Sequence, residues 1–218
     1  MFEIEVLDGL KSARLLEHLV FGGGTMLRLC HELNRYSVDL DFWFAQQVPQ
    51  KAFFEKLRAT LARRYEITDA QMKRFSLLIE LRSSGYPKRL KIEVRRGEKE
   101  FEVQNTIAFS RFSTRQVLLK THTLAQSMRN KVAALLDRGE VRDGFDIEFM
   151  LRRGVTFPPL SADEIQAMQE RAAGFPIRDF KVKLGSIVDA DTRLYYAENR
   201  FAFLLERLQT LSPPGSQA

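Results

Sequence analysis

The chain has 218 residues, of which 44% are hydrophobic, and this is enough to bury one large core or two smaller ones. No run approaches the ~18 apolar residues of a membrane-spanning helix, and the acidic start MFEIEVLDGLK is unlike a secretion signal, so we predict a cytoplasmic protein without a membrane partner. The single cysteine, Cys30, excludes internal disulfides and thiolate zinc clusters, and the net charge of +6 predicts attraction to polyanions.

Strand and helix patterns alternate through the first half of the chain. We expect, in chain order, a helix at 11–18, a buried strand at 19–23, a helix at 25–33, a half-buried strand at 38–44, a helix from Pro49 to about Ala62, and strands at 75–83 and 89–96. Beyond residue 105 the apolar spacing is mostly helical and ends in one last helix near 191–210. The pattern predicts an α+β or α/β fold with a mixed-sheet lobe at 1–105, a mainly helical lobe at 106–211 and a disordered tail at 212–218.

The stretch FGGGTMLRL, at 21–29, places Gly23, Gly24 and Thr25 between a strand and a helix. A glycine turn at a helix N-terminus lets backbone N–H groups approach a phosphate, and the helix dipole favours the negative charge. Thr25 is expected at this N-terminus, with its hydroxyl free to cap the helix or to contact an oxyanion. A tight structural turn with a threonine cap explains the same residues, so the motif alone decides neither reading.

The stretch RYSVDLDFWF, at 35–44, places Asp39 and Asp41 two residues apart on a strand. Both carboxylates then project from one face, where they repel each other unless a cation such as Mg²⁺ lies between them. Glu93, in the middle of a later strand, is a candidate third ligand. Solvent exposure on an edge strand is the alternative for the pair, and a surface ion pair with Lys91 or Arg95 is the alternative for Glu93.

The order of these motifs resembles the nucleotidyltransferase superfamily that includes DNA polymerase beta. More closely, it resembles the AbiEii/AbiGii toxin family of bacterial type IV toxin–antitoxin and phage-exclusion systems, to which the MenT toxins are related. The residues that match are Gly23, Gly24, Thr25, Leu27 and Arg28, then Ser37, Asp39, Leu40, Asp41 and Phe42, and in the helical half Lys131, Arg138, Asp143 and Asp146. Arg142 stands where the family carries a lysine.

The resemblance implies transfer of a nucleotide from a nucleoside triphosphate to an acceptor, with release of pyrophosphate. Gly23, Gly24 and Thr25 would hold the phosphates, and Asp39 and Asp41, with Glu93 as third carboxylate, would carry Mg²⁺ or Mn²⁺. The helical lobe would close the cleft. Lys131 would contact phosphates from that lobe, and Asp143 would either accept the nucleophile's proton or orient Lys131.

Several assignments stay open at this level. Arg28 and Ser37 are expected to line the nucleotide site. Asp146 and Arg142 are possible site residues, although a helical aspartate beside arginines also forms ordinary ion pairs. The favoured acceptor is the 3′ end of tRNA, because the middle of the chain is basic and related toxins modify tRNA. The family also implies a separately encoded antitoxin as protein partner.

Two other functions account for the same sequence. A non-catalytic module with this fold would bind RNA or a protein partner, but such a module has no evident need for two repelling carboxylates beside a glycine turn. A nucleotidyltransferase of this kind could also modify a hydroxyl of a protein or a small molecule. A kinase-like phosphotransferase is disfavoured, since the chain contains neither a P-loop ending in GK[ST] nor a kinase catalytic loop.

Overall fold

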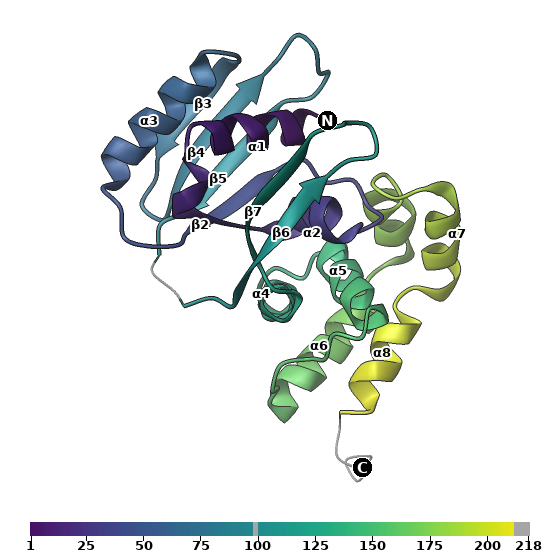
Figure 1. Cartoon of the computed structure of the whole chain (residues 1–218). Coiled ribbons are helices and arrows are strands. Elements are labelled where there is room, and N and C mark those ends of the chain that lie inside the picture. The colour runs from purple at the N-terminus through teal and green to yellow at the C-terminus, as the bar shows by residue number, and fades with distance from the viewer. Residues whose placement is uncertain (98–99, 212–218) are drawn as a thin grey trace. The chain divides into compact units, whose positions relative to one another are not determined.

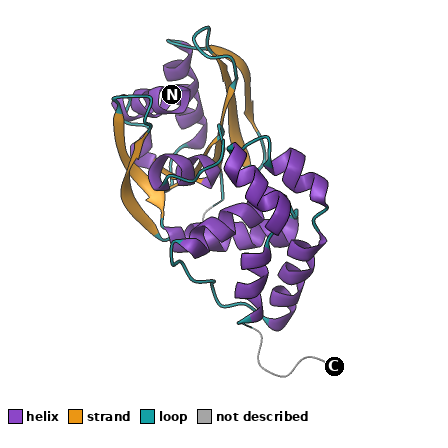
Figure 2. Ribbon diagram, turned by 90° about the vertical axis from the view of Figure 1, so that its right-hand side faces the viewer, coloured by secondary structure: helices purple, strands orange, loops and turns teal. Residues whose placement is uncertain are grey.

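The computed structural model describes residues 1–97 and 100–211, and the chain divides into two compact units (Figure 1). Unit 1 contains Met1–Leu33 and Ser37–Thr123, and unit 2 contains Asn34–Tyr36 and the chain from Leu124 onward. The seven strands of the described chain all belong to unit 1, whereas the described part of unit 2 consists of helices and loops, as the colours of Figure 2 show.

Unit 1 is built on one mixed sheet with the strand order β3-β4-β5-β2-β1-β7-β6. The strands are β1 (Leu19–Gly22), β2 (Leu40–Phe44), β3 (Glu66–Met72), β4 (Ser76–Arg82), β5 (Leu90–Arg95), β6 (Val103–Phe109) and β7 (Gln116–His122). Strand β2 is antiparallel to β1 and parallel to β5, and β1 is parallel to β7. Because β2 pairs on both sides, Asp41 does not lie on an edge strand.

The two faces of the sheet differ in chemistry around β2 and β5. Leu40, Phe42, Ile92 and Val94 are almost completely buried on one face. Residues between them, Asp41 among them, point to the opposite face because side chains alternate along a strand. Three helices pack against the sheet: α1 (Phe2–Ser12) contacts β7, α2 (Gly23–His31) contacts β2 and β6, and α3 (Gln50–Ala62) contacts β3. The apolar face of β2 and β5 is thus part of the core, and the half-buried Asp41 and Glu93 point to the other face.

Unit 2 is a helical assembly with its own aromatic core. Its elements are α4 (Leu124–Asp137), α5 (Val141–Arg152), α6 (Ala162–Gly174), a π-helical segment (Asp179–Leu184), α7 (Ala190–Asn199) and α8 (Ala202–Gln209). Phe201 is fully buried and its ring contacts those of Phe175, Phe180 and Tyr196. A capping box between Ser161 and Glu164 starts α6 and satisfies backbone donors at its first turn.

The expected α/β fold with a mixed sheet is confirmed, and so are the strands near 19–23, 38–44, 75–83 and 89–96 and the helix that follows Pro49. The first helix is α1, at Phe2–Ser12, and the expected helix at 11–18 is wrong except for a short 3₁₀ turn at Leu16–His18. The expected last helix at 191–210 is two helices, because the backbone breaks at Arg200, whose φ is 50°.

The expected lobe boundary at residue 105 also needs correction. Strands β6 and β7 extend the sheet, so the first compact unit continues to Thr123. The alternation of apolar and polar residues in these strands is weak, because few apolar side chains lie on their buried face. Ala108 and Val117 are the fully buried ones among those side chains. The expected disordered tail at 212–218 lies outside the described residues. No helix in the described ranges is long and apolar enough to cross a membrane.

Candidate nucleotide and metal site

The glycine stretch forms a direct junction between β1 and α2. Strand β1 ends at Gly22 and α2 begins at Gly23, whose φ of +75° lies in the left-handed region. The N-cap of this nine-residue helix is Gly22, which has no side chain to accept from the first backbone N–H groups. Such N–H groups have no intrahelical acceptor, and this arrangement favours an anion at a helix N-terminus.

The junction packs directly against the Asp41 carboxylate. Gly22 pairs with Asp41 across β1 and β2. A Cβ atom placed on Gly23 would overlap with Asp41 Oδ2 and would lie 3.1 Å from both Cβ and Cγ of Asp41. Glycine is thus required at position 23 for two reasons, since the backbone conformation is left-handed and the carboxylate fills the space that a side chain would need.

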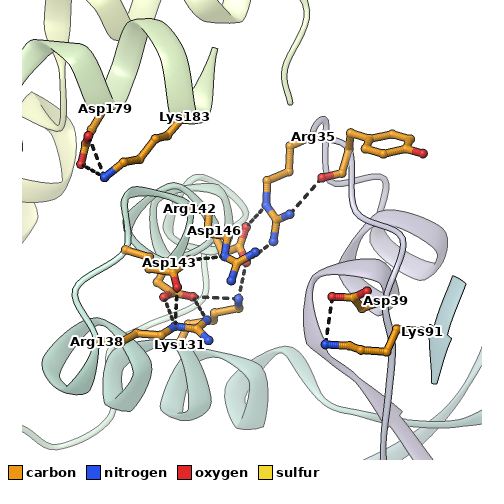
Figure 3. A network of polar contacts seen from close by, with 12 residues as sticks. Arg35, Asp39, Lys91, Lys131, Arg138, Arg142, Asp143, Asp146, Asp179 and Lys183 are labelled. Atoms are coloured by element: carbon orange, nitrogen blue, oxygen red, sulfur yellow. Dashed lines mark hydrogen bonds and ion pairs between the residues drawn. The ribbon is translucent and has the colours of Figure 1, made fainter. Parts of the chain in front are cut away.

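Three carboxylates gather on the face of the sheet opposite to Leu40 and Phe42. Asp41 pairs with Glu93 across the parallel strands β2 and β5, and Asp39 directly precedes β2. Lys91 Nζ lies 3.5 Å from Asp39 Oδ2, the pair drawn in Figure 3, and 3.7 Å from Glu93 Oε2. Burial raises the pKa of Asp41, and the charges of Asp39 and Glu93 raise it further, although Arg95 and Lys91 partly offset them.

The residues fit a divalent cation by their donor chemistry. Carboxylate oxygens are the ligands that Mg²⁺ prefers, and burial together with the charges of Asp39 and Glu93, which raise the pKa of Asp41, disfavours its ionised form in a way that a bound cation would offset. Within the described residues, however, no three such side chains already converge as a finished metal site. A bound Mg²⁺ would take the remaining ligands from water and from substrate phosphates, as this ion commonly does.

The neighbouring expected residues are engaged in contacts within unit 1. Thr25 is the third residue of α2 and fully buried, and its hydroxyl donates to Ser37 Oγ over 3.0 Å. Thr25 therefore lies in the first turn of the helix, as the sequence suggested, but its hydroxyl proton is already donated to Ser37. Arg28 donates to Glu3 Oε1 over 2.5 Å and ties α2 to α1. Gly24, the second residue of α2, is buried.

Unit 2 holds a separate network around Lys131, at the centre of Figure 3. Lys131 Nζ donates to Asp143 Oδ1 over 3.0 Å and lies 2.6 Å from Asp146 Oδ2. Each aspartate also receives a bidentate guanidinium. Arg138 Nε and Nη2 both lie 2.8 Å from the Asp143 oxygens, and Arg35 Nε and Nη2 lie 2.6 and 2.7 Å from those of Asp146. Lys131 therefore sits between two carboxylates that are each already paired with an arginine.

The charges of this network explain how it keeps its ionisation while buried. Burial alone would raise the pKa of both aspartates. For Asp146 the charges and hydrogen bonds of Arg35 and Lys131 outweigh it and lower the pKa to about 2. For Asp143 the hydrogen bond and charge of Arg138, with the charge of Lys131, lower the pKa as well. Three cations face two carboxylates, so the group carries one net positive charge.

The other residues of the second motif lie at its margin. Arg142 Nε lies 2.6 Å from Glu140 Oε2, and both side chains are largely exposed. The ion pair of Arg142 is thus with Glu140, whereas Asp143 is held by Arg138 and Lys131. Asp146, which the sequence left open between a site residue and an ordinary ion pair, is fully buried and takes part in the Lys131 network.

Comparison with known proteins shows the family of the chain. Residues 5–214 match the family described as "Nucleotidyl transferase AbiEii toxin, Type IV TA system". The chain belongs to the AbiEii family. As an AbiEii protein it is a nucleotidyltransferase of the toxin class, and the type IV systems to which this family belongs pair such a toxin with an antitoxin. No curated protein matches the chain.

Two solved structures share the AbiEii chain's fold. JHP933 from Helicobacter pylori is 19% identical, with a TM-score of 0.50 over 95% of this chain and 94% of that one. A candidate nucleotidyltransferase from H. pylori is 18% identical, with a TM-score of 0.55 over 96% of this chain and 98% of that one. At this identity the likeness establishes the fold, and it supports the mixed sheet with helices described above.

In this AbiEii chain, the tertiary structure brings the expected site residues together in two clusters and adds residues that were not expected there. Gly23, Asp39, Asp41 and Glu93 come together in unit 1, and Lys131, Asp143 and Asp146 come together in unit 2. Lys91 was considered only as an ion-pair partner of Glu93, and its contact with Asp39 was not anticipated. Arg35 was missed altogether. The only sequence signal for Arg35 was its place immediately before the Ser-x-Asp-x-Asp motif, and nothing local indicated that it binds an aspartate 111 residues away.

Proposed function

We propose that the chain transfers a nucleotide from a nucleoside triphosphate to an acceptor hydroxyl in a reaction that depends on Mg²⁺, or on Mn²⁺ in its place. The observation that supports the proposal is the contact between the glycine junction and Asp41, because backbone N–H groups at a helix N-terminus then lie beside a cluster of carboxylates. A non-catalytic binding module would have no use for the unfavourable electrostatics that raise the pKa of Asp41.

The protein's part in this chemistry is positioning and charge stabilisation. The N–H groups at the start of α2 would hold the phosphates, and Asp39, Asp41 and Glu93 would hold the divalent cation. That cation, when bound, would neutralise phosphate charge as the pyrophosphate leaves. The acceptor oxygen attacks the α-phosphorus, its proton passes to a base, and the bond from the α-phosphorus to the bridging oxygen breaks.

Lys131 and Asp143 are assigned distinct roles. Lys131 would contact phosphate oxygens. The net positive charge of its network supports this role. So does its ammonium group, which directs two of its three N–H bonds to Asp143 and Asp146 within the described chain. Asp143 would orient Lys131. A general base is the less favoured role, because three hydrogen bonds from cations occupy its oxygens and its pKa is lowered.

The favoured acceptor is the 3′ end of tRNA. Unit 1, which carries the carboxylates, has 20 lysines and arginines against 15 aspartates and glutamates, so most of the net charge of +6 lies there. A basic surface attracts a polyanion and suits RNA better than an acidic or neutral one. Action in the cytoplasm, where tRNA is found, is part of the same proposal, as is a cognate antitoxin that counteracts the toxin.

The test is incubation of the purified chain with Mg²⁺, each of the four α-³²P-labelled nucleoside triphosphates and total tRNA, beside an Asp41→Ala variant. Label that enters RNA only with the wild type would support the enzyme, its nucleotide and its acceptor together. If neither protein transfers label and both bind nucleotide equally in Mg²⁺, Asp41 is not a metal ligand and the binding module becomes the better explanation. Nucleotide binding by the wild type alone, without transfer to RNA, would remove tRNA as the acceptor.

A further inference from the structure

The short segment that links α2 to β2 is anchored in unit 2. Residues Asn34–Tyr36 belong to that unit, although the chain on both sides belongs to unit 1. The Asn34 amide donates to the side chains of Asp189 and Thr192, and Tyr36 N donates to Ile187 O over 2.5 Å. Arg35 lies between these two anchors, and only 6% of its surface is exposed.

The guanidinium of Arg35 makes most of its hydrogen bonds to one carboxylate. Nε and Nη2 reach Asp146 Oδ1 and Oδ2, and Nη1 donates to the carbonyl of the neighbouring Tyr36 over 3.2 Å (Figure 3). A planar fork of this kind fixes both the position and the charge of its partner. Lys131 Nζ lies 2.6 Å from Asp146 Oδ2, the same oxygen that receives Arg35 Nη2. Arg35 and Lys131 therefore share one carboxylate.

The consequence follows from the charge balance around Lys131. With Arg35 present, three cations face two aspartates and one positive charge remains. Without Arg35, only Lys131 and Arg138 face Asp143 and Asp146, and the net charge is zero. In a buried site such a change acts strongly, because little water is present to screen it. The positive charge that a phosphate would meet at Lys131 thus depends on a residue that need not touch the phosphate.

We propose that Arg35 is a positioning residue for nucleotidyl transfer, which neutralises Asp146 so that the charge of Lys131 stays available to the triphosphate. The inference rests on the proposed function, because it needs Lys131 to act on phosphates. It adds to that function a residue outside the two aspartate motifs, and it explains why a buried arginine is placed in the connection between the glycine helix and the carboxylate strand.

Three variants separate charge from structure. Arg35→Lys keeps the cation but loses the planar fork, and because the inference concerns charge it should lose clearly less kcat/KM for the nucleoside triphosphate than Arg35→Gln, on the order of 3-fold. Arg35→Gln removes the cation and should lower kcat/KM on the order of 10- to 100-fold. The double variant Arg35→Gln/Asp146→Asn removes one charge of each sign, restores the net positive charge, and should recover most of that loss. Each protein is first checked for the wild-type circular dichroism spectrum and melting curve.

Arg152 supplies the matched control. It pairs with Glu148 at 2.7 Å, and Glu148 is a fully buried carboxylate of the same unit that has no contact with Lys131 among the interactions of the described chain. Arg152→Gln, like Arg35→Gln, takes the arginine from a buried carboxylate of unit 2, although the Arg152 side chain is itself 43% exposed, and it should leave kcat/KM unchanged. A fall in kcat/KM for Arg152→Gln as large as for Arg35→Gln would show that any weakened buried ion pair in unit 2 has this effect, and it would overturn the inference.

Combination with Lys131→Ala decides whether Arg35 acts through Lys131. In the Lys131→Ala background, Arg35→Gln should cost less than about 2-fold, because the charge it protects is absent. Equal losses with and without Lys131, or no recovery in the Arg35→Gln/Asp146→Asn variant, would overturn the inference while the proposed function stands. A wild-type protein that neither transfers nucleotide nor binds a triphosphate in Mg²⁺ would overturn both.

Discussion

Replacement of Gly23 by alanine tests whether the glycine junction and Asp41 form one site. The φ of +75° costs an alanine about 1–2 kcal/mol, equivalent to a fall in melting temperature of roughly 2–8 °C for a chain of this size. The new Cβ would also overlap with Asp41 Oδ2, whereas real Cβ atoms essentially never come within 3.0 Å of such a neighbour. Asp41 must then retreat by roughly half an ångström or more, and a misplacement approaching 1 Å can cost about 100-fold in rate.

Gly154 provides a control with the same backbone strain and no steric consequence. Its φ is +80°, and a Cβ placed there would meet nothing within 4 Å. We expect Gly154→Ala to lose about the same 1–2 kcal/mol of stability, measured by thermal unfolding, while it keeps wild-type transfer activity. Gly23→Ala should lose on the order of 10- to 100-fold in kcat at saturating nucleotide. Equal activities for the two variants would refute the idea that the glycine makes room for a working carboxylate.

Three further predictions concern the charged clusters. Burial and neighbouring carboxylates raise the pKa of Asp41, so its ionised form destabilises the folded protein at any pH above the ordinary pKa of an aspartate. Asp41→Asn should therefore abolish transfer and, without metal, raise the free energy of unfolding at pH 7 by about 0.5–2 kcal/mol. A variant that is less stable than the wild type in EDTA would contradict this. Lys91 lies between Asp39 and Glu93, so Lys91→Gln should tighten Mg²⁺ binding roughly 2- to 5-fold by calorimetry, and weaker binding would count against competition by the ammonium. The pKa of Asp146 falls from 3.8 to about 2, so the stability that its ionised form contributes is present at neutral pH and is lost as the pH drops through that interval. Asp146→Asn should lower the free energy of unfolding at pH 7 by about 3–5 kcal/mol and should make stability depend less on pH between these two values. An unchanged acid transition would exclude this role.

The local helices and strands around the site could be predicted from the sequence. The run LVFGG followed by an apolar helical pattern predicted a strand, a turn and a helix, and β1 and α2 meet at Gly22 and Gly23. The alternation in VDLDFWF predicted a strand with its aspartates on one face, and β2 buries Leu40 and Phe42 with Asp41 opposite to them. These features depend on backbone conformation and side-chain period over a few residues, which a sequence carries directly.

The partners of those residues were decided only by the tertiary structure. The parallel register of β2 and β5 sets Asp41 beside Glu93, and strand pairing across about fifty residues leaves no trace in local periodicity. Strands β6 and β7 were missed because pairing and packing in the sheet, more than their own weak apolar pattern, make them strands. Arg35 was missed because its role depends on a carboxylate 111 residues away. By itself, then, the sequence determined the elements and the residue types of this nucleotidyltransferase, while the long-range register of the sheet and the buried charge balance decided which of those residues act together.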